Sequence, residues 1–375
     1  MDWIVPLADL DYGPEEEEAV LNVLRSRWLT MGGVTGEFEA RFAALTGSKY
    51  AFAVSNATQA LHLACLALGV GPGDEVIVPS LTFVATANAV LYTGAEVRFA
   101  DIIGPDDLTI DPAEIERLIT PRTKTVIVMH YAGYPCRMPE IMDIAGRHGI
   151  AVIEDAAHAP GAFLDGRALG SWGKIGCFSF FSNKNLSTGE GGMLVTDDDA
   201  LAGKVRLQRS HGMTSLTYDR HKGHAFSYDV VDLGFNDRID EIRAALGVAQ
   251  LAKLARNNAR RADLTRAYWQ ALAPLGLGLP FSTTMLGQPA HHIFPILLPP
   301  GVDRQAFMER LRDAGVQSSI HYRPVHTFSY YRDRYGVQGL PRTEDAAARE
   351  VTLPLYPTMG EERVKMVVEA AKSAF

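Results

Sequence analysis

The sequence feature that most constrains the fold is a series of short apolar runs that alternate with segments of helical periodicity. Most of these runs are apolar along their length rather than at every second position. Strands of this kind are typical of parallel sheets, because helices cover both faces of the sheet and no face needs to be polar. The runs therefore predict an α/β fold, with a mostly parallel sheet sandwiched by helices. They are Ala51–Val54, Val76–Val78, Val97–Ala100, Thr125–Met129, Ala151–Ile153, Cys177–Phe180 and Met193–Val195.

Helical patterns lie before and between the runs. Residues 14–29 predict an amphipathic helix, with Val20, Leu21 and Leu24 on its apolar face. Ligands of doubly wound sheets bind at the carboxyl ends of the strands, so we expect the chemistry in the loops that follow the apolar runs. The other helices predicted in this half of the chain are Glu37–Leu45, Ala60–Leu68, Val84–Tyr92, Pro112–Leu118 and Pro139–His148.

The pattern changes in the second half of the chain. Residues 205–232 are polar and aperiodic, which predicts a long loop, and a long helix follows over residues 240–272. Beyond Pro280 we expect a strand at 292–298, a helix at 304–314, a strand at 318–322 and then helices. The sequence thus predicts a large α/β domain of residues 1–245 and a smaller C-terminal α+β domain of residues 246–375.

Composition excludes several classes of protein. The formal net charge is −8 and no long basic run occurs, which argues against binding of nucleic acid or of an anionic membrane. The chain has no apolar stretch long enough to span a bilayer and no signal-peptide pattern, so we expect a cytoplasmic enzyme. Its 3 cysteines lie far apart and indicate neither a disulfide framework nor a metal site.

One loop after an apolar run is suited to binding an anion. Residues 55–61 (Ser-Asn-Ala-Thr-Gln-Ala-Leu) follow the first run and open a helix. The free N–H groups and partial positive charge of a helix N-terminus favour a phosphate there. The alternative is ordinary helix capping by Ser55 or Thr58.

Two further loops carry acid and amine groups. Residues 152–158 place Asp155 and His158 at the end of a strand, where a carboxylate can keep a ring nitrogen protonated. The alternative for Asp155 is a helix N-cap.

Residues 178–192 hold one lysine, Lys184, in a polar, glycine-rich turn. A partly desolvated lysine can form a Schiff base, whereas a solvated surface lysine has no such role. A phosphate cradle, a ring-nitrogen acid and a Schiff-base lysine are the three anchors that pyridoxal phosphate needs, so the three loops together predict that cofactor.

The order and spacing of these loops resemble the DegT/DnrJ/EryC1/StrS family of pyridoxal-phosphate-dependent sugar aminotransferases, from about Pro6 to Ala370. Residues 178–192 are similar to the lysine signature of the family, and residues 152–159 to its Glu-Asp-Ala-Ala segment. Residues 233–251 and 353–357 resemble its Gly-Tyr-Asn-x-Arg segment and its closing strand. The resemblance implies fold type I, the fold of aspartate aminotransferase.

The resemblance also implies roles for individual residues. Lys184 would hold the cofactor as an internal aldimine and carry the proton in transamination, and Asp155 would pair with the pyridine nitrogen. Asn236 would reach the phosphate of a neighbouring subunit, which implies a homodimer with shared sites. The other residues implied to bind the cofactor are Ala57, Thr58 and Ser179 at the phosphate, Phe83 stacked on the ring, and His158 on its hydroxyl side.

The implied reaction is a ping-pong transfer from L-glutamate or L-glutamine to a keto sugar, most simply an NDP-4-keto sugar. A branch of the family with histidine in place of the lysine is a dehydratase, so Lys184 favours aminotransfer. Residues 321–326 are similar to the branch that aminates 4-keto nucleotide sugars. The candidate substrate residues are Trp28, Thr30, Arg238, His321, Tyr322, Arg323 and His326, and the loop 211–228 is a further candidate.

Three alternatives remain open at this point. The acceptor could be a keto-cyclitol such as scyllo-inosose. The protein could be a non-catalytic sensor that binds pyridoxal phosphate, although no basic DNA-reading module accompanies it. A desulfurase would need an exposed, activated thiol, for which Cys136 is the sole loop candidate.

Overall fold

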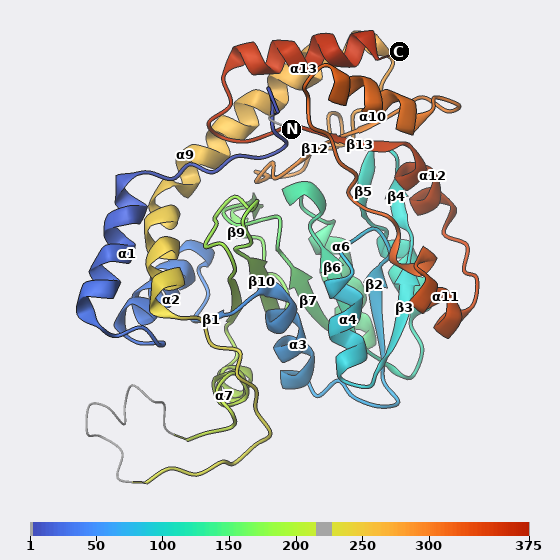
Figure 1. Cartoon of the computed structure of the whole chain (residues 1–375). Coiled ribbons are helices and arrows are strands. Elements are labelled where there is room, and N and C mark those ends of the chain that lie inside the picture. The colour runs from blue at the N-terminus through green and yellow to red at the C-terminus, as the bar shows by residue number, and fades with distance from the viewer. Residues whose placement is uncertain (1–2, 215–226, 375) are drawn as a thin grey trace.

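The computed structural model describes residues 3–214 and 227–374. All seven apolar runs form strands of one 7-stranded sheet, as predicted (Figure 1). Five neighbouring strands are parallel, and β11 alone runs against both of its neighbours. In spatial order the strands are β1 (Tyr50–Val54), β11 (Gly192–Thr196), β10 (Ile175–Ser179), β7 (Ala151–Asp155), β6 (Thr123–Met129), β2 (Glu75–Pro79) and β3 (Glu96–Ala100).

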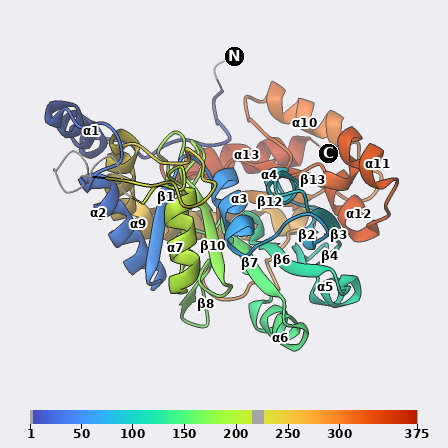
Figure 2. The ribbon, with the colours of Figure 1, turned by 90° about the horizontal axis from the view of Figure 1, so that it is seen from below.

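Helices cover both faces of this sheet. Figure 2 shows α3 (Ala57–Ala67) and α4 (Ala85–Tyr92) on one side of the strands, and α5 (Pro112–Leu118) and α6 (Met138–His148) on the other. On β2, Val76 and Val78 belong to the core under α3 and α4, whereas Ile77 belongs to the core under α5 and α6. Because successive side chains point to opposite faces and both faces are covered, the whole strand is apolar.

The N-terminal helix differs from its prediction in length and in orientation. Helix α1 (Pro14–Ser26) ends three residues early, because Arg27 has a left-handed φ of 59° and its N–H bonds back to Leu24. The predicted apolar face is wrong, since Leu21 and Leu24 are 44% and 48% exposed. The buried side carries Glu16, whose carboxylate receives hydrogen bonds of 2.8 Å from two side chains of α9 (Glu241–Leu272), and this ionic contact sets the rotation of α1.

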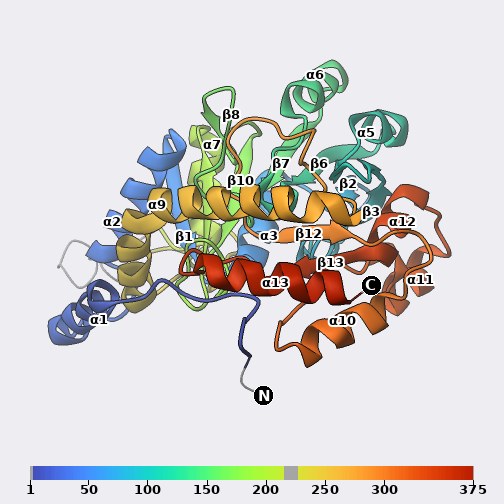
Figure 3. The ribbon, with the colours of Figure 1, turned by 90° about the horizontal axis from the view of Figure 1, so that it is seen from above.

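The C-terminal part packs at one end of the large sheet. Helices α9 and α13 (Glu361–Ser373) lie side by side across it (Figures 1 and 3). Beneath them, β12 (Phe294–Leu297) and β13 (Glu350–Leu353) form a 2-stranded antiparallel sheet. The other α-helices and β-strands of the described residues are α2 (Gly33–Thr46), α7 (Asp199–Gln208), α10 (Arg304–Asp313), α11 (Ser329–Tyr335), α12 (Pro341–Arg349), β4 (Ile102–Gly104), β5 (Asp107–Ile110), β8 (Phe163–Leu164) and β9 (Arg167–Ala168).

Two predictions for the second half need correction. Residues 318–322 form no strand, since they make only an isolated bridge through Ser319, and the N–H of His321 bonds to the side chain of Glu350 at 2.7 Å. The loop predicted from residue 205 begins after α7, which ends at Gln208. Of the candidate substrate loop 211–228, residues 215–226 lie outside the described residues.

The division into domains at residue 245 stays a prediction, because α9 is continuous through that position. Within the described residues, no helix combines the length and the apolar character that crossing a membrane requires.

Candidate active site

A cavity of about 470 Å³ lies at the carboxyl ends of the parallel strands. It brings together the three loops that the sequence analysis singled out. The residues predicted to bind the cofactor that line it are Ala57, Thr58, Phe83, Asp155, His158, Ser179 and Lys184. They end or follow β1, β2, β7 and β10, so the expectation that chemistry gathers at this edge of the sheet agrees with the fold.

The loop after β1 forms the anion cradle of the cavity. Asn56, not Ser55 or Thr58, is the N-cap of α3, and its side chain accepts the N–H of Gln59 at 3.0 Å. The N–H groups of Ala57 and Thr58 lie in the first helical turn, where no intrahelical acceptor exists. Capping and anion binding are therefore compatible at this helix.

Close packing of backbone holds the cradle in place. Gly192, at the start of β11, lies so near α3 that a Cβ atom would stand 2.6 Å from the carbonyl carbon of Asn56 and 2.8 Å from the nitrogen of Ala57. Only glycine fits this approach. The strand thus fixes where the first N–H groups of α3 point.

Asp155 is a buried carboxylate at the end of β7. It accepts hydrogen bonds from the Thr86 hydroxyl at 2.7 Å and from the Ala157 N–H at 3.1 Å. Burial raises its pKa, while these hydrogen bonds and the nearby charge of Lys184 oppose the rise. Both hydrogen-bond donors are neutral, so a protonated ring nitrogen would supply the cation that this carboxylate can stabilise.

Lys184 lies in the turn after β10, with its amine in the cavity wall. Burial lowers its pKa from 10.5 to about 7, and the charge of Asp155 limits the fall. Its Nζ lies 3.3 Å from Nε2 of His292. At neutral pH an amine with this pKa is neutral in a large fraction of the molecules, as a nucleophile requires.

His158 is bound on both ring nitrogens. The Ala132 N–H donates to its Nδ1 at 3.2 Å, so its Nε2 carries the proton and donates to the Tyr322 hydroxyl oxygen at 3.0 Å. Burial, together with the charge of Lys184, holds the pKa of His158 well below its usual value. The histidine is therefore a neutral, fixed part of the wall, and its contact with the hydroxyl side of a cofactor ring stays a prediction.

Phe83 and Tyr322 form an aromatic corner of the cavity. Phe83 is 56% exposed although its neighbours Leu81 and Thr82 are buried, and its ring lies 6.0 Å from that of Tyr322. An aromatic face this exposed is suited to covering a flat ligand ring.

The predicted substrate residues are divided between the cavity and other places. His321 and Tyr322 line the cavity. His326 is buried behind it, bonded to Ser80 at 2.7 Å and to Glu344 at 3.1 Å, in agreement with a packing role. Arg323 points to the surface, where its guanidinium donates to Thr327.

The remaining predicted residues lie outside the cavity of their own chain. Asn236 is exposed and pairs with Ser210, and Arg238 pairs with Val54, through isolated bridges. The Asp237 carbonyl accepts the Ser55 N–H at 3.0 Å, so this segment borders the anion cradle. Trp28 packs against Gly32, and Thr30 bridges to Asp240 before α9.

Sequence reasoning missed several residues of the site. The Thr86 hydroxyl bonds to Asp155, and His292 reaches Lys184. Asn183 lines the cavity, and its buried Oδ1 has no hydrogen-bond partner among the described residues. Thr86 follows the predicted aromatic Phe83 by three residues, which a search for polar groups near strand ends would find. His292 is 108 residues from Lys184 and has no local signal.

The cysteines offer no reactive thiol. Cys65, Cys136 and Cys177 are all buried, and burial raises the pKa of each thiol. Cys136, the loop candidate, donates its S–H to the Met129 carbonyl. Desulfurase chemistry requires the opposite environment.

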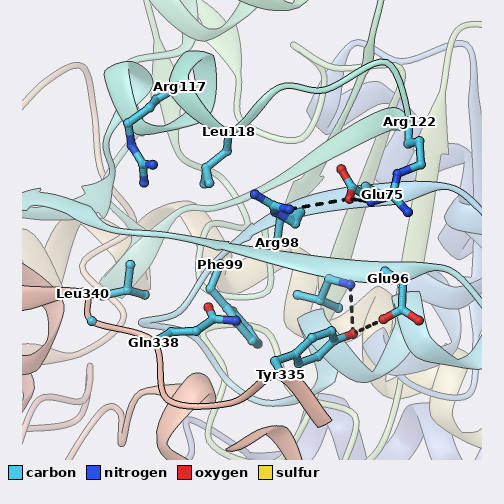
Figure 4. A pocket seen from close by; sticks show the side chains of 12 residues that line it. Glu75, Glu96, Arg98, Phe99, Arg117, Leu118, Arg122, Tyr335, Gln338 and Leu340 are labelled. Carbon is cyan, nitrogen blue, oxygen red and sulfur yellow. Dashed lines mark hydrogen bonds and ion pairs between the residues drawn. The ribbon is translucent and has the colours of Figure 1, made fainter.

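A second cavity of about 480 Å³ lies beside the edge strand β3 (Figure 4). Its buried Glu75 already pairs with Arg122 at 2.5 Å and Arg98 at 3.6 Å, and its Glu96 accepts from Tyr335 at 2.8 Å. None of the predicted catalytic residues lines it. The cavity around Lys184 is therefore the candidate active site.

A parallel sheet whose strand ends gather an amine, a buried carboxylate and a helix N-terminus defines the class of the protein, which is an aminotransferase of fold type I. The chain belongs to the DegT/DnrJ/EryC1/StrS aminotransferase family, whose model matches residues 11–372. The family inferred from the sequence is thus confirmed.

Solved structures support this assignment. The aminotransferase TlmJ from Streptoalloteichus hindustanus is 32% identical, with a TM-score of 0.90 over 99% of this chain and 98% of that chain. DesV of S. venezuelae, in complex with a ketimine intermediate, is 36% identical, with a TM-score of 0.88 over 96% and 94% of the two chains. Spr1654 from Streptococcus pneumoniae, described as a sugar aminotransferase in its PLP form, is 26% identical, with a TM-score of 0.91 over 99% and 98%.

Proposed function

We propose that this aminotransferase uses pyridoxal 5′-phosphate to move an amino group from L-glutamate or L-glutamine to a keto sugar, most simply an NDP-4-keto (deoxy)sugar in the cytoplasm. The observation that carries the proposal is the low-pKa amine of Lys184 in one cavity with the Asp155 carboxylate and the N-terminus of α3. Relatives described as sugar aminotransferases support the class of acceptor.

The residues of the cavity fit this cofactor. The free N–H groups of Ala57 and Thr58 suit a phosphate dianion, and the Ser179 hydroxyl lies on the same wall. Asp155 suits a protonated ring nitrogen, and Phe83 suits the face of a ring. When bound, pyridoxal phosphate supplies an electron-accepting ring that makes the substrate C–H bond acidic.

Each of these residues would then have a separate role in the reaction. The N-terminus of α3 binds and orients the phosphate, and Asp155 holds the proton at the ring nitrogen. Lys184, as a neutral amine, would take the proton from the α-carbon of the amino donor and deliver it to the C4′ atom of the cofactor. Phe83 and Tyr322 would cover the bound ring and limit its contact with water.

The acceptor side of the cavity carries two polar groups suited to a sugar. Nδ1 of His321 lies 2.8 Å from the Thr352 hydroxyl, which leaves Nε2 of the ring for a ligand. The Tyr322 hydroxyl oxygen accepts a hydrogen bond from His158, so its own O–H can donate to a ligand. A ring nitrogen and a phenol hydroxyl can both form hydrogen bonds with the hydroxyl groups of a sugar.

We further propose that a homodimer completes the site, with Asn236 of each subunit reaching the phosphate of the other. Asn236 is exposed and does not line the cavity of its own chain, although it borders the cradle segment. Arg238, Trp28 and Thr30 would lie near the same border and approach the nucleotide.

The test begins with the visible absorption spectrum of the purified protein, before and after addition of L-glutamate. We expect a yellow band that moves to shorter wavelength with glutamate or glutamine, and a Lys184→Ala variant in which the lysine-dependent band is absent. Acceptor trials then compare 4-keto nucleotide sugars with scyllo-inosose. Turnover with the cyclitol alone would replace the sugar proposal. A band that ignores both donors would point to a sensor.

A further inference from the structure

The contact between Lys184 and His292 joins two distant parts of the chain. His292 precedes β12, and its Nε2 lies 3.3 Å from the reactive Nζ. His292 is only 4% exposed, so no solvent competes freely for this contact. The tautomer of His292 decides which of the two groups donates the hydrogen bond.

Hydrogen bonds of neighbouring side-chain amides determine this tautomer. The Nδ2 group of Asn185 donates to Oδ1 of Asn258 at 2.8 Å and to the Ala290 carbonyl at 2.7 Å, which fixes the orientation of the Asn185 amide. Its Oδ1 therefore faces His292 as an acceptor and lies 2.9 Å from Nδ1. The proton of His292 is thus on Nδ1, and the lone pair on Nε2 is directed at Lys184.

The other groups that face His292 keep it neutral. The His158 ring packs against it with centroids 4.3 Å apart, and Arg261 donates to its carbonyl at 3.0 Å. Burial and the charges of Lys184, Arg261 and the neighbouring histidines hold the pKa of His292 well below its usual value. Asp155 is the anion whose charge acts on Lys184.

We propose that His292 is a positioning residue for the reaction, because it accepts a hydrogen bond from Lys184 Nζ while Asn185 fixes its tautomer. One N–H of the lysine is then anchored at the wall, and the nitrogen is held at a defined point of the cavity. The mechanistic use of this anchor rests on the proposed function, but the hydrogen bond itself does not.

The proposal predicts a change in the titration of Lys184 that can be measured without cofactor. The rate at which trinitrobenzenesulfonate labels Lys184 is followed against pH in the cofactor-free protein, with the labelled peptide quantified by mass spectrometry. In His292→Phe the ammonium loses its acceptor, so we expect the midpoint to fall by about one pH unit. In His292→Gln, whose amide oxygen can take the place of Nε2, we expect a midpoint close to that of the native protein.

His291→Phe is the matched control. His291 is the neighbouring histidine, is equally buried and bonds to Tyr134 rather than to Lys184, so its variant should leave the midpoint unchanged. An unchanged midpoint in a folded His292→Phe, or equal falls in both Phe variants, would overturn the proposal.

A second measurement needs no substitution. Nitrogen-15 NMR of the histidine-labelled native protein reports which nitrogen of His292 carries the proton, with His292→Gln used to assign the signal. A proton on Nδ1 supports the proposal, and a proton on Nε2 contradicts it. If the native protein shows no donor reaction, the proposed function fails, whereas both measurements on His292 still give an answer.

Discussion

At the scale of single residues, the burial of Lys184 has a cost that depends on pH. Its pKa is about 7 in the folded chain and 10.5 ordinarily, so between these values the unfolded chain binds more protons, and stability rises with pH across that window. Below pH 7 both states are protonated, and the full cost of the buried charge is present. Replacing the lysine with an apolar residue should remove this cost.

We therefore predict that Lys184→Met stabilises the cofactor-free protein by ~3 kcal/mol at pH 6.5, with a gain that shrinks steadily towards pH 10. Urea unfolding of both proteins at several pH values measures the difference. Lys174→Met, which removes an exposed lysine, is the control and should show no such trend. A gain that grows with pH would contradict the assignment of the low pKa to Lys184.

Asp155 offers a second test at this scale. Asp155→Asn keeps the shape of the side chain, and its amide can still accept from Ala157 and donate to the Thr86 oxygen. The negative charge is lost, so the ring nitrogen would no longer be held protonated, and we predict a fall of ~10²–10³-fold in the rate of the glutamate half-reaction. Stopped-flow absorbance measures this rate. Thr86→Val, which removes one neutral hydrogen bond, should cost far less, and equal losses would argue that packing alone is responsible.

The same residues show what the sequence can predict about a site. Lys184 and Asp155 each follow an apolar strand within one loop, so local pattern is sufficient to find them. Asn258 and His292 lie 73 and 107 residues from Asn185, and their roles depend on hydrogen bonds that only the folded chain forms. Local pattern holds no information about such a network.

At the scale of elements, the approach of β11 to α3 is the contact that shapes the phosphate cradle. In Gly192→Ala the new methyl group would meet backbone atoms of Asn56 and Ala57, which cannot rotate away. We predict a loss of ~1–3 kcal/mol in stability and an affinity for the cofactor that is at least ~10-fold weaker. Chemical denaturation and a fluorescence titration with pyridoxal phosphate measure the two effects.

Gly203→Ala is the control for this substitution. Gly203 lies inside α7, where a Cβ atom would meet nothing within 4 Å. Alanine there should leave binding unchanged and raise stability by ~0.5–1 kcal/mol. Comparable loss of affinity in both variants would show that β11 does not hold the cradle in the way described.

The elements also show where sequence patterns are insufficient. The strands are found because burial on both faces leaves a continuous apolar run. Residues 318–322 look like another strand, but the Glu350 side chain takes the N–H of His321 and no ladder forms. The orientation of α1 follows from the burial of Glu16 against α9, an ionic contact that apolar periodicity cannot predict.

At the scale of the whole molecule, large apolar side chains are exposed in the segment that leads to Asn236. Leu233 is 80% exposed, Val230 58% and Val231 56%, and they lie three to six residues before Asn236 in sequence. Phe181 of the lysine turn is 44% exposed as well. Exposed apolar residues of this kind are typical of association surfaces, which supports the proposal of a dimer with Asn236 near its interface.

If each active site is built from residues of both subunits, the activity of mixed dimers can be predicted quantitatively. Lys184→Ala subunits and Asn236→Ala subunits should each form dimers of low activity, the second at least ~10-fold below the native protein. In a mixed dimer, one site combines the intact Lys184 of one subunit with the intact Asn236 of the other, while the second site carries both substitutions. Random mixing makes half of the dimers mixed, so unfolding and refolding the two variants together should restore about a quarter of the native activity. If Asn236 acted within its own subunit, no mixed dimer would contain an intact site and no activity would return, even when mass spectrometry shows that mixed dimers have formed.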